Sequence, residues 1–345
     1  MKQTKMNKKN KVSKKHKKQE RKNRLFYLMI LLLMTTISLS FTSYAWFSTN
    51  RLVRVDLLDV NVRAQGGIEI SADGTNWRGA LSVYDIEEAR STYPNSVNQI
   101  PKTLEPVSTI GQLENGKLKM FYGTAENDLY GNYILSAERS IETESFDESS
   151  NGKFIAFDIF LKTNKQSQLY LTPLSNVMYN GETSVGIENA VRIAFVEEGN
   201  VPTGTNIETI QSVYTNEREN VYIWEPNYNT HTPSGIENAR NLYGINASLD
   251  YEIIEYDGIS NPISSSQKIY TSRAKSNLYP AYFSKVNINY YTENNFTTNK
   301  EIFTLKSGIT KYRVYMWIEG QDVDCENNAS IGNITLNLQF TTNPS

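Results

Sequence analysis

Hydrophobic and polar residues alternate along much of the chain after residue 50, a pattern typical of β-strands with two unlike faces. The last segment is the clearest, because Ile334, Leu336, Leu338 and Phe340 alternate with hydroxyl and amide residues. Residues 311–320 show the same period, and the polar stretch 319–330 predicts that these two strands pair antiparallel. Similar runs cover residues 58–64, 67–71, 154–162, 168–172, 191–196, 221–224, 251–256, 282–290 and 302–305.

These runs predict an all-β, jelly-roll-like β-sandwich whose first strand, within residues 53–64, closes against its last, within residues 331–342. The pair Asp73-Gly74 predicts a tight hairpin turn. Two short helices are expected in the loops, at residues 82–90 and 234–244. The second has a capping residue at Ser234, and Gly244 stands where a helix ends.

One continuous apolar stretch precedes these strands. Residues 25–41 contain no charge, and a helix over residues 25–45 reaches roughly 30 Å, enough to cross a bilayer. Residues 1–24 hold twelve basic residues and one acidic residue, so this tail is expected in the cytoplasm and residues 46–345 outside the cell. The sequence therefore predicts three parts: a basic tail (1–24), a membrane helix (25–45) and an extracellular β-domain (46–345).

The exported part is acidic. The whole chain has 35 basic and 37 acidic residues, so residues 46–345 keep 23 and 36 and carry a net charge of −13. Such a charge repels polyanions, and nucleic acid is therefore excluded as a partner of this part. The single cysteine, Cys325, cannot form an internal disulfide, so the fold depends on core burial.

Catalytic motifs are scarce, and we expect no enzymatic activity. Only His16 and His231 are present, and His16 falls in the basic tail, so a metal site with two histidines cannot form outside the cell. A Cys325–His231 dyad has no recognisable nucleophile context. Glycoside hydrolysis by two carboxylates stays open as a less favoured alternative.

One acidic segment has metal-ligand spacing. Asp322, Asp324 and Glu326 are two residues apart, so in extended backbone their oxygens face the same way, as Ca²⁺ requires. The alternative is a solvated acidic turn. No other cofactor is expected.

Three tryptophans of the exported part, Trp77, Trp224 and Trp317, suit two interpretations. Exposed together, they would form a platform for a sugar or a protein. Buried, they would pack the core of a large β-domain, which is the favoured interpretation.

The end of the membrane helix has the features of a cleavage site. Ser43 and Ala45 place small side chains at the −3 and −1 positions of a signal peptidase, leaving Trp46 as the new N-terminus. The segment SYAWFSTN, followed by VDLLDVNV, resembles the leader of Gram-positive exported proteins matured by the SipW-type signal peptidase, which include the TasA and camelysin group of biofilm fibre proteins. The resemblance covers about 25 residues. The alternative is an uncut helix that anchors the protein permanently.

The resemblance implies a structural matrix protein that is secreted after cleavage and assembles with itself. In TasA-like assemblies an N-terminal segment completes the sheet of the next subunit, which here would be residues 46–55; otherwise this segment pairs within its own sandwich. The second hypothesis is a membrane-anchored module that binds carbohydrate or protein.

Overall fold

The computed structural model describes residues 27–30, 54–127, 133–142, 152–180, 186–237, 257–259, 268–271, 283–285, 288–320, 322, 324–325 and 331–344. The chain divides into two compact units, residues 1–44 and 45–345. Residues 27–30 are helical, and no helix among the described residues is both long and apolar enough to span a bilayer. The rest of the predicted membrane helix, residues 25–45, lies outside the described residues.

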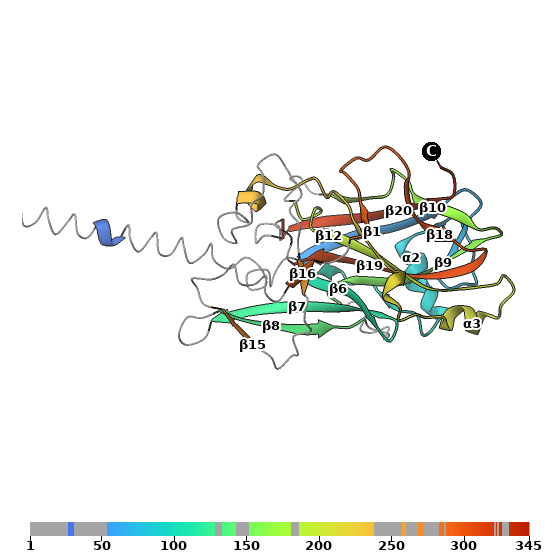
Figure 1. Ribbon diagram of the computed structural model, residues 1–345, viewed down its shortest axis with the longest axis horizontal. Coiled ribbons are helices and arrows are strands. Elements are labelled where there is room, and N and C mark those ends of the chain that lie inside the picture. The colour runs from blue at the N-terminus through green and yellow to red at the C-terminus, as the bar shows by residue number, and fades with distance from the viewer. Residues whose placement is uncertain are drawn as a thin grey trace, which may run out of the picture. The chain divides into compact units, whose positions relative to one another are not determined.

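The second unit is rich in β-structure, as the alternation predicts, and most of its strands form two sheets (Figure 1). The seven-stranded sheet contains β18 (Lys300–Leu305), β10 (Ser167–Leu171), β20 (Ile331–Thr341), β1 (Arg54–Ala64) and β3 (Ala80–Leu81), with β11 (Asn176–Tyr179) and β5 (Thr103–Leu104) at its margins. The eleven-stranded sheet contains β15 (Lys268–Thr271), β8 (Tyr133–Ser140), β7 (Lys117–Asn127), β6 (Pro106–Glu114), β19 (Gly308–Glu319), β12 (Val191–Val201), β13 (Val221–Glu225) and β17 (Tyr290–Tyr291), with β9 (Ile155–Thr163), β2 (Glu69–Ser71) and β4 (Asn98–Gln99) beside them. A small sheet pairs β14 (Asp257–Ile259) with β16 (Phe283–Lys285).

The predicted closure of the first strand against the last is confirmed. β1 runs parallel to β20, with Val60 opposite Leu336 and Val62 opposite Leu338. All four side chains are buried, and they join one core cluster with residues of β9, β12 and β19 from the other sheet. The two sheets therefore enclose a shared hydrophobic core, with β1 in the interior of one of them.

The predicted antiparallel pairing of the last two long strands is wrong. β19 pairs with β9 and β12 in the larger sheet, and β20 pairs with β1, β10 and β11 in the smaller one. The two strands instead contribute to the same core from different sheets. β19 is also buried along its whole length, because a second apolar cluster that includes Tyr315 and Trp317 covers its other face.

The turn and helix predictions are largely confirmed. Asp73 accepts hydrogen bonds from the backbone N–H groups of Thr75 and Asn76, both at 2.8 Å, which forms the tight turn after β2. Ser82 caps α2 (Val83–Glu88), which continues into the short 3-10 helix η1 (Ala89–Ser91). Two further helices were not predicted from the sequence, α3 (Ile207–Ser212) and the 3-10 helix η3 (Arg218–Asn220).

The other predicted helix begins earlier than expected. Residues 233–237 are helical, and the backbone N–H of Gly235 donates to Thr232 Oγ1 at 3.1 Å, so Thr232 takes the capping role that we assigned to Ser234. Residues 238–244 lie outside the described part of the chain.

Candidate functional site

The predicted acidic segment leaves the end of β19 as a hydrogen-bonded turn. The N–H of Asp322 donates to the carbonyl of Glu319 at 3.0 Å, and the N–H of Cys325 donates to the carbonyl of Asp322 at 3.0 Å. This curvature directs Asp322 and Asp324 into the protein, where both are buried. The two carboxylates therefore share one site, as their spacing predicts, but through a turn and not through extended backbone.

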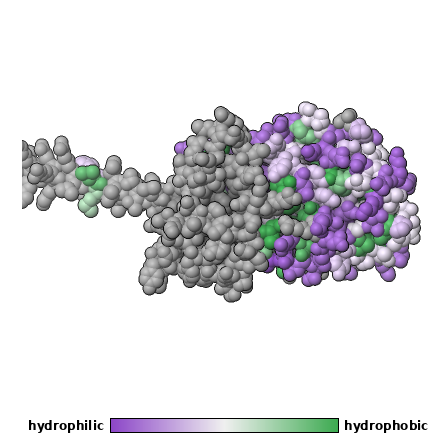
Figure 2. All heavy atoms as spheres, viewed as in Figure 1, coloured by the Kyte–Doolittle hydropathy of each residue, from purple (hydrophilic) through white to green (hydrophobic). Residues whose placement is uncertain are grey.

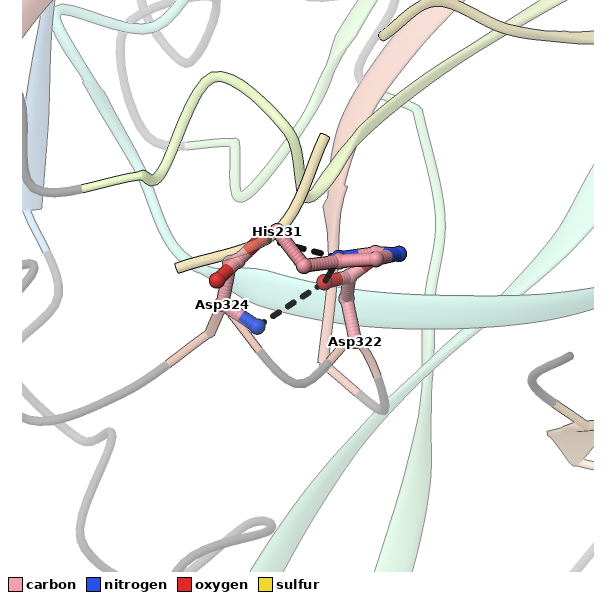
Figure 3. A group of neighbouring side chains, drawn as sticks. All are labelled: His231, Asp322 and Asp324. Atoms are coloured by element: carbon pink, nitrogen blue, oxygen red, sulfur yellow. Dashed lines mark hydrogen bonds and ion pairs between the residues drawn. The ribbon is translucent and has the colours of Figure 1, made fainter. Parts of the chain in front are cut away.

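His231 meets these carboxylates from the segment after β13 (Figure 3). Its Nδ1 lies 3.0 Å from Oδ2 of Asp324 and 4.0 Å from Oδ1 of Asp322. The three potential ligand atoms all lie within 4.8 Å of one another, and all three residues are buried. The described residues thus bring an imidazole nitrogen and two carboxylate oxygens to one point.

Neighbouring donors fix the orientation of Asp324. Its Oδ1 accepts from the backbone N–H of Thr232 at 2.8 Å and from the hydroxyl of Thr232 at 2.7 Å. Its Oδ2, which faces His231, also accepts from the side-chain amide of Asn189 at 3.1 Å. Thr232 is the helix cap described above, so the same residue starts the helix at 233 and orients this carboxylate.

Arg192, at the start of β12, orients Asp322. Its guanidinium donates to Oδ2 of Asp322 at 2.6 Å and pairs with Oε1 of Glu225 at 2.8 Å. The other oxygen of Asp322 accepts from the N–H of Asp324 at 2.9 Å and lies on the side of His231. Each aspartate therefore turns one oxygen toward the imidazole, and that oxygen accepts one further hydrogen bond, while its other oxygen is held by Thr232 or Arg192.

Negative charge is in excess at this site. We define the His231 cluster as Arg192, Glu225, His231, Glu319, Asp322 and Asp324, all of which are buried. Glu319 belongs to it because its charge, with those of Glu225 and Asp322, acts on the Arg192 guanidinium. Among the described residues, four carboxylates in the cluster face one guanidinium and one imidazole. Unbalanced charge in a protein interior is costly, so such a group favours the uptake of protons or of a cation.

The pKa values of Asp322, Glu225 and His231 are all raised, which is the direction expected where negative charge is in excess. Burial raises the pKa of Asp322 against the opposing charge of Arg192, and it does the same for Glu225. Burial alone would lower the pKa of His231, but the hydrogen bond to Asp324 and the charge of Asp322 outweigh it and raise that pKa. The three groups therefore bind protons more readily than they would in water.

The geometry changes the predicted chemistry of the acidic segment. Calcium prefers six to eight oxygen ligands, whereas the converging set holds two carboxylates and an imidazole, and Glu326 lies outside the described residues. A nitrogen and two oxygens suit a first-row transition-metal ion better. The alternative of a solvated acidic turn is wrong for Asp322 and Asp324, which are 3% and 1% exposed. Cys325 is buried in the same turn and is not exposed as a nucleophile.

The three tryptophans do not share a surface. Trp224 is buried in the main core, and its Nε1 donates to Oγ1 of Thr292 at 2.8 Å. Trp317 is buried in the second cluster on the other face of β19, and its Nε1 donates to Glu319 at 3.1 Å. Trp77 is partly buried beneath the ammonium group of Lys162. The core-packing interpretation is confirmed for Trp224 and Trp317, and the exposed platform is wrong. The proposed cleavage residues Ser43, Ala45 and Trp46 lie outside the described part.

The sequence analysis missed a second group of buried charges at the other end of β19. We define the Asp158 cluster as Asp158, Glu198, Lys311 and Arg313. Nε and Nη2 of Arg313 bind the two carboxylate oxygens of Asp158 at 2.8 and 3.3 Å, and Lys311 Nζ lies 3.6 Å from Oδ2. Glu198 lies 3.4 Å from Arg313. A charged residue inside the apolar run FIAFDIFL was the available signal for this cluster.

A cleft of about 640 Å³ lies beside the Asp158 cluster. Lys311 and Arg313 form part of its lining, together with Lys117, Tyr214 and amide or hydroxyl residues of the 93–97 and 208–212 segments. Its rim includes the turn Asn115-Gly116, where both residues adopt positive φ, 53° and 72°. The Gly116 N–H donates to Oδ1 of Asn216 at 2.6 Å, and the Gly116 carbonyl accepts from Arg313 at 2.8 Å, so this rim is held in place.

Comparisons with models of protein families, with curated proteins and with solved structures find no match for this chain.

Proposed function

We propose that this chain is a non-enzymatic, exported β-sandwich protein with a structural role at the cell surface, anchored by residues 25–45 or released after Ala45. The position of β1 supports this proposal most directly. β1 begins nine residues after Ala45 and lies in the interior of the seven-stranded sheet, where it pairs with β20, β3 and β5. Any load transmitted from a membrane anchor would thus enter a strand of the core.

The parallel pairing adds to this argument. β1 and β20 run in the same direction over ten paired positions. A pull between the N-terminal end of β1 and the C-terminal end of β20 acts along both strands, so it loads these inter-strand hydrogen bonds together and does not open them one at a time. Val60 and Val62 would also have to leave the core. This geometry suits a protein that is held at one end and loaded mechanically.

The pairing of β1 within its own chain limits which N-terminal residues can be donated to a neighbouring subunit. Arg54 and Val55 pair with Ile331 and Gly332 of their own chain, and residues 46–53 lie outside the described part. A donated segment is therefore best assigned to residues 46–53, since donation of β1 itself would open the core. On the face shown in Figure 2, the described surface is mainly hydrophilic with small scattered hydrophobic groups, so a broad apolar patch for assembly is not present on the described part of this face.

Blocking cleavage tests the proposal. We expect material in the culture medium to begin at Trp46 and to form polymers. An Ala45→Leu variant should stay in the membrane fraction without polymer. Ser38→Leu, a similar change upstream of the cleavage positions, should behave like the wild type. Filaments that persist in the Ala45→Leu strain would contradict the assembly role, and a body protected from protease on intact cells would contradict export.

The cleft beside the Asp158 cluster favours one second candidate, a saccharide-binding module. Its lining combines amide and hydroxyl groups with the basic side chains of Lys117, Lys311 and Arg313. These groups surround the ring of Tyr214, which is 63% exposed and rests against Gly116. An exposed ring on a fixed rim is a common element of sugar recognition. Tyr214→Ala should abolish glycan binding measured by calorimetry, whereas Tyr84→Ala, at an exposed tyrosine that does not line the cleft, should not. Equal binding by wild type and Tyr214→Ala would exclude this site.

A further inference from the structure

Three features of the His231 cluster point to an ion-binding site. The first is convergence, because Nδ1 of His231 faces one oxygen from each of Asp322 and Asp324. In a tetrahedral zinc site, metal–ligand distances of about 2.0–2.2 Å separate neighbouring ligand atoms by roughly 3.3 Å. The observed N···O separations of 3.0 and 4.0 Å lie on either side of that value. Small shifts of side chains would bring all three atoms to a common ion.

The second feature is the support behind each ligand. Metal-binding carboxylates are usually held through their other oxygen by neighbouring donors, which fixes their direction. Thr232 supplies two such donors to Oδ1 of Asp324, and Arg192 supplies one to Oδ2 of Asp322. Both aspartates are therefore oriented before any ion arrives.

The third feature is charge. With His231 neutral, the described members of the cluster carry three more negative than positive charges, and all are buried. A divalent cation would remove most of this excess. The nearby positive charge of Arg192 does not block the position, because the guanidinium contacts the oxygen of Asp322 that faces away from His231.

From these features we propose that His231, Asp322 and Asp324 bind one divalent first-row transition-metal ion of the Zn²⁺ class. Imidazole together with carboxylates suits such ions, and the described residues supply three of the four ligands of a tetrahedral site. The ion joins the turn after β19 to the segment that follows β13. The ion replaces the proton between the imidazole and the carboxylates and stabilises the contact between these two connections.

Metal content and thermal stability test the proposal. The full chain is purified in detergent without a histidine tag, in a His16→Gln background that removes the other imidazole, and is stripped with a chelator. We expect one Zn²⁺ per chain after dialysis against excess ZnCl₂ and a rise in Tm of about 5 °C. His231→Gln and Asp324→Asn should lose both responses.

Two further measurements keep the outcome decisive. Glu198→Gln is the matched control, because it changes a buried carboxylate at the other end of the β12–β19 pair and should retain both zinc responses. Co²⁺ bound to the wild-type chain should give a visible ligand-field spectrum without a thiolate charge-transfer band, and Zn²⁺ should displace it. A thiolate band would reassign the ion to Cys325 and overturn the proposal. Absence of bound zinc in folded wild-type protein, or equal binding by wild type and folded His231→Gln, would also overturn it.

Discussion

The two ends of β19 hold two buried charged groups that differ in charge balance. In the Asp158 cluster, two acids pair directly with two bases, and one further buried acid, Glu142, is influenced by the charge of Arg313, whereas among the described residues of the His231 cluster four acids share one guanidinium and one imidazole. Burial opposes ionisation of the carboxylates at both ends, yet the charges of Arg313 and Lys311 lower the pKa of Asp158, while the pKa of Asp322 is raised.

The difference shows that close opposite charges decide whether the effect of burial is overcome: the charges of Arg313 and Lys311 overcome it at Asp158, whereas the charge of Arg192 does not overcome it at Asp322. An acidic excess leaves a place for a proton or a cation, which is why the proposed metal site lies at that end of the strand. Substitutions that remove one charge at a time therefore separate the two behaviours.

The largest effect is expected at the balanced end. Asp158→Asn removes the carboxylate that binds Arg313 through two hydrogen bonds, so that Glu198 is the one acid still in an ion pair with Arg313 in the described part of the chain. Removing one partner of a buried ion pair typically costs 3–5 kcal/mol, and we expect a loss of about that size in the free energy of unfolding. Chemical denaturation measures it. Glu69→Gln, which breaks a surface pair with Lys162, is the control and should cost less than about 1 kcal/mol.

A pH-dependent effect is expected at Glu198, the less closely paired acid of the same cluster. Burial raises its pKa to about 7, although the charge of Arg313 opposes this shift. The folded state therefore binds the proton of Glu198 more tightly than the unfolded state does, where the pKa is about 4.5. The stabilisation by protonated Glu198 is fully present below pH 4.5 and is lost as the pH rises through 7. Glu198→Gln removes this loss. The variant should be about 1–3 kcal/mol more stable than the wild type at pH 8 and similar to it at pH 5. A constant difference between the two pH values would contradict this assignment.

A smaller effect is expected at the edge of the same cluster. The hydroxyl of Tyr93 lies 3.0 Å from Oδ2 of Asp158 and 2.7 Å from the carbonyl of Gln211. Tyr93→Phe keeps the ring beside Phe160 but removes this donor, so about 1 kcal/mol of unfolding free energy should be lost. In the Asp158→Asn background the same change should cost less, because the hydroxyl then has one charged acceptor fewer. A double-mutant cycle measures this coupling.

The sequence predicted the strands but only part of their partners. Alternation located β1, β9, β12, β19 and β20, since a two-residue period is a local property. Which strands pair depends on contacts between residues far apart in the chain. The pairing of β1 with β20 was predicted correctly, but the predicted pairing of β19 with β20 was wrong. The hairpin of β6 and β7 was overlooked, although Asn115-Gly116 is a strong turn signal.

The candidate site shows the same limit. The spacing of Asp322 and Asp324 predicted a shared site on the assumption of extended backbone. The site forms through a turn instead, because residues two positions apart stay close in either conformation. His231 is 93 residues away from Asp324, and only the fold brings it there. The role of Arg192 in the site was not predicted, for a different reason. Arg192 stands at the start of a strand otherwise rich in apolar residues, where a long side chain can turn outward to water or inward to a partner.

The smallest effect is expected for the substitution that most directly contrasts the two ends of β19. Glu225→Gln removes one negative charge from the His231 cluster, as Asp158→Asn does from the Asp158 cluster, and both keep the size of the side chain. Arg192 still holds Asp322 at 2.6 Å, and three other carboxylates remain, so no buried cation is left unpaired. The raised pKa of Glu225 also shows that its charge is costly in the fold. We expect a change within about 1 kcal/mol at pH 7, measured by denaturation without added metal. A loss as large as that of Asp158→Asn would mean that the acidic excess is balanced in the folded protein, and the distinction between the two clusters would be wrong.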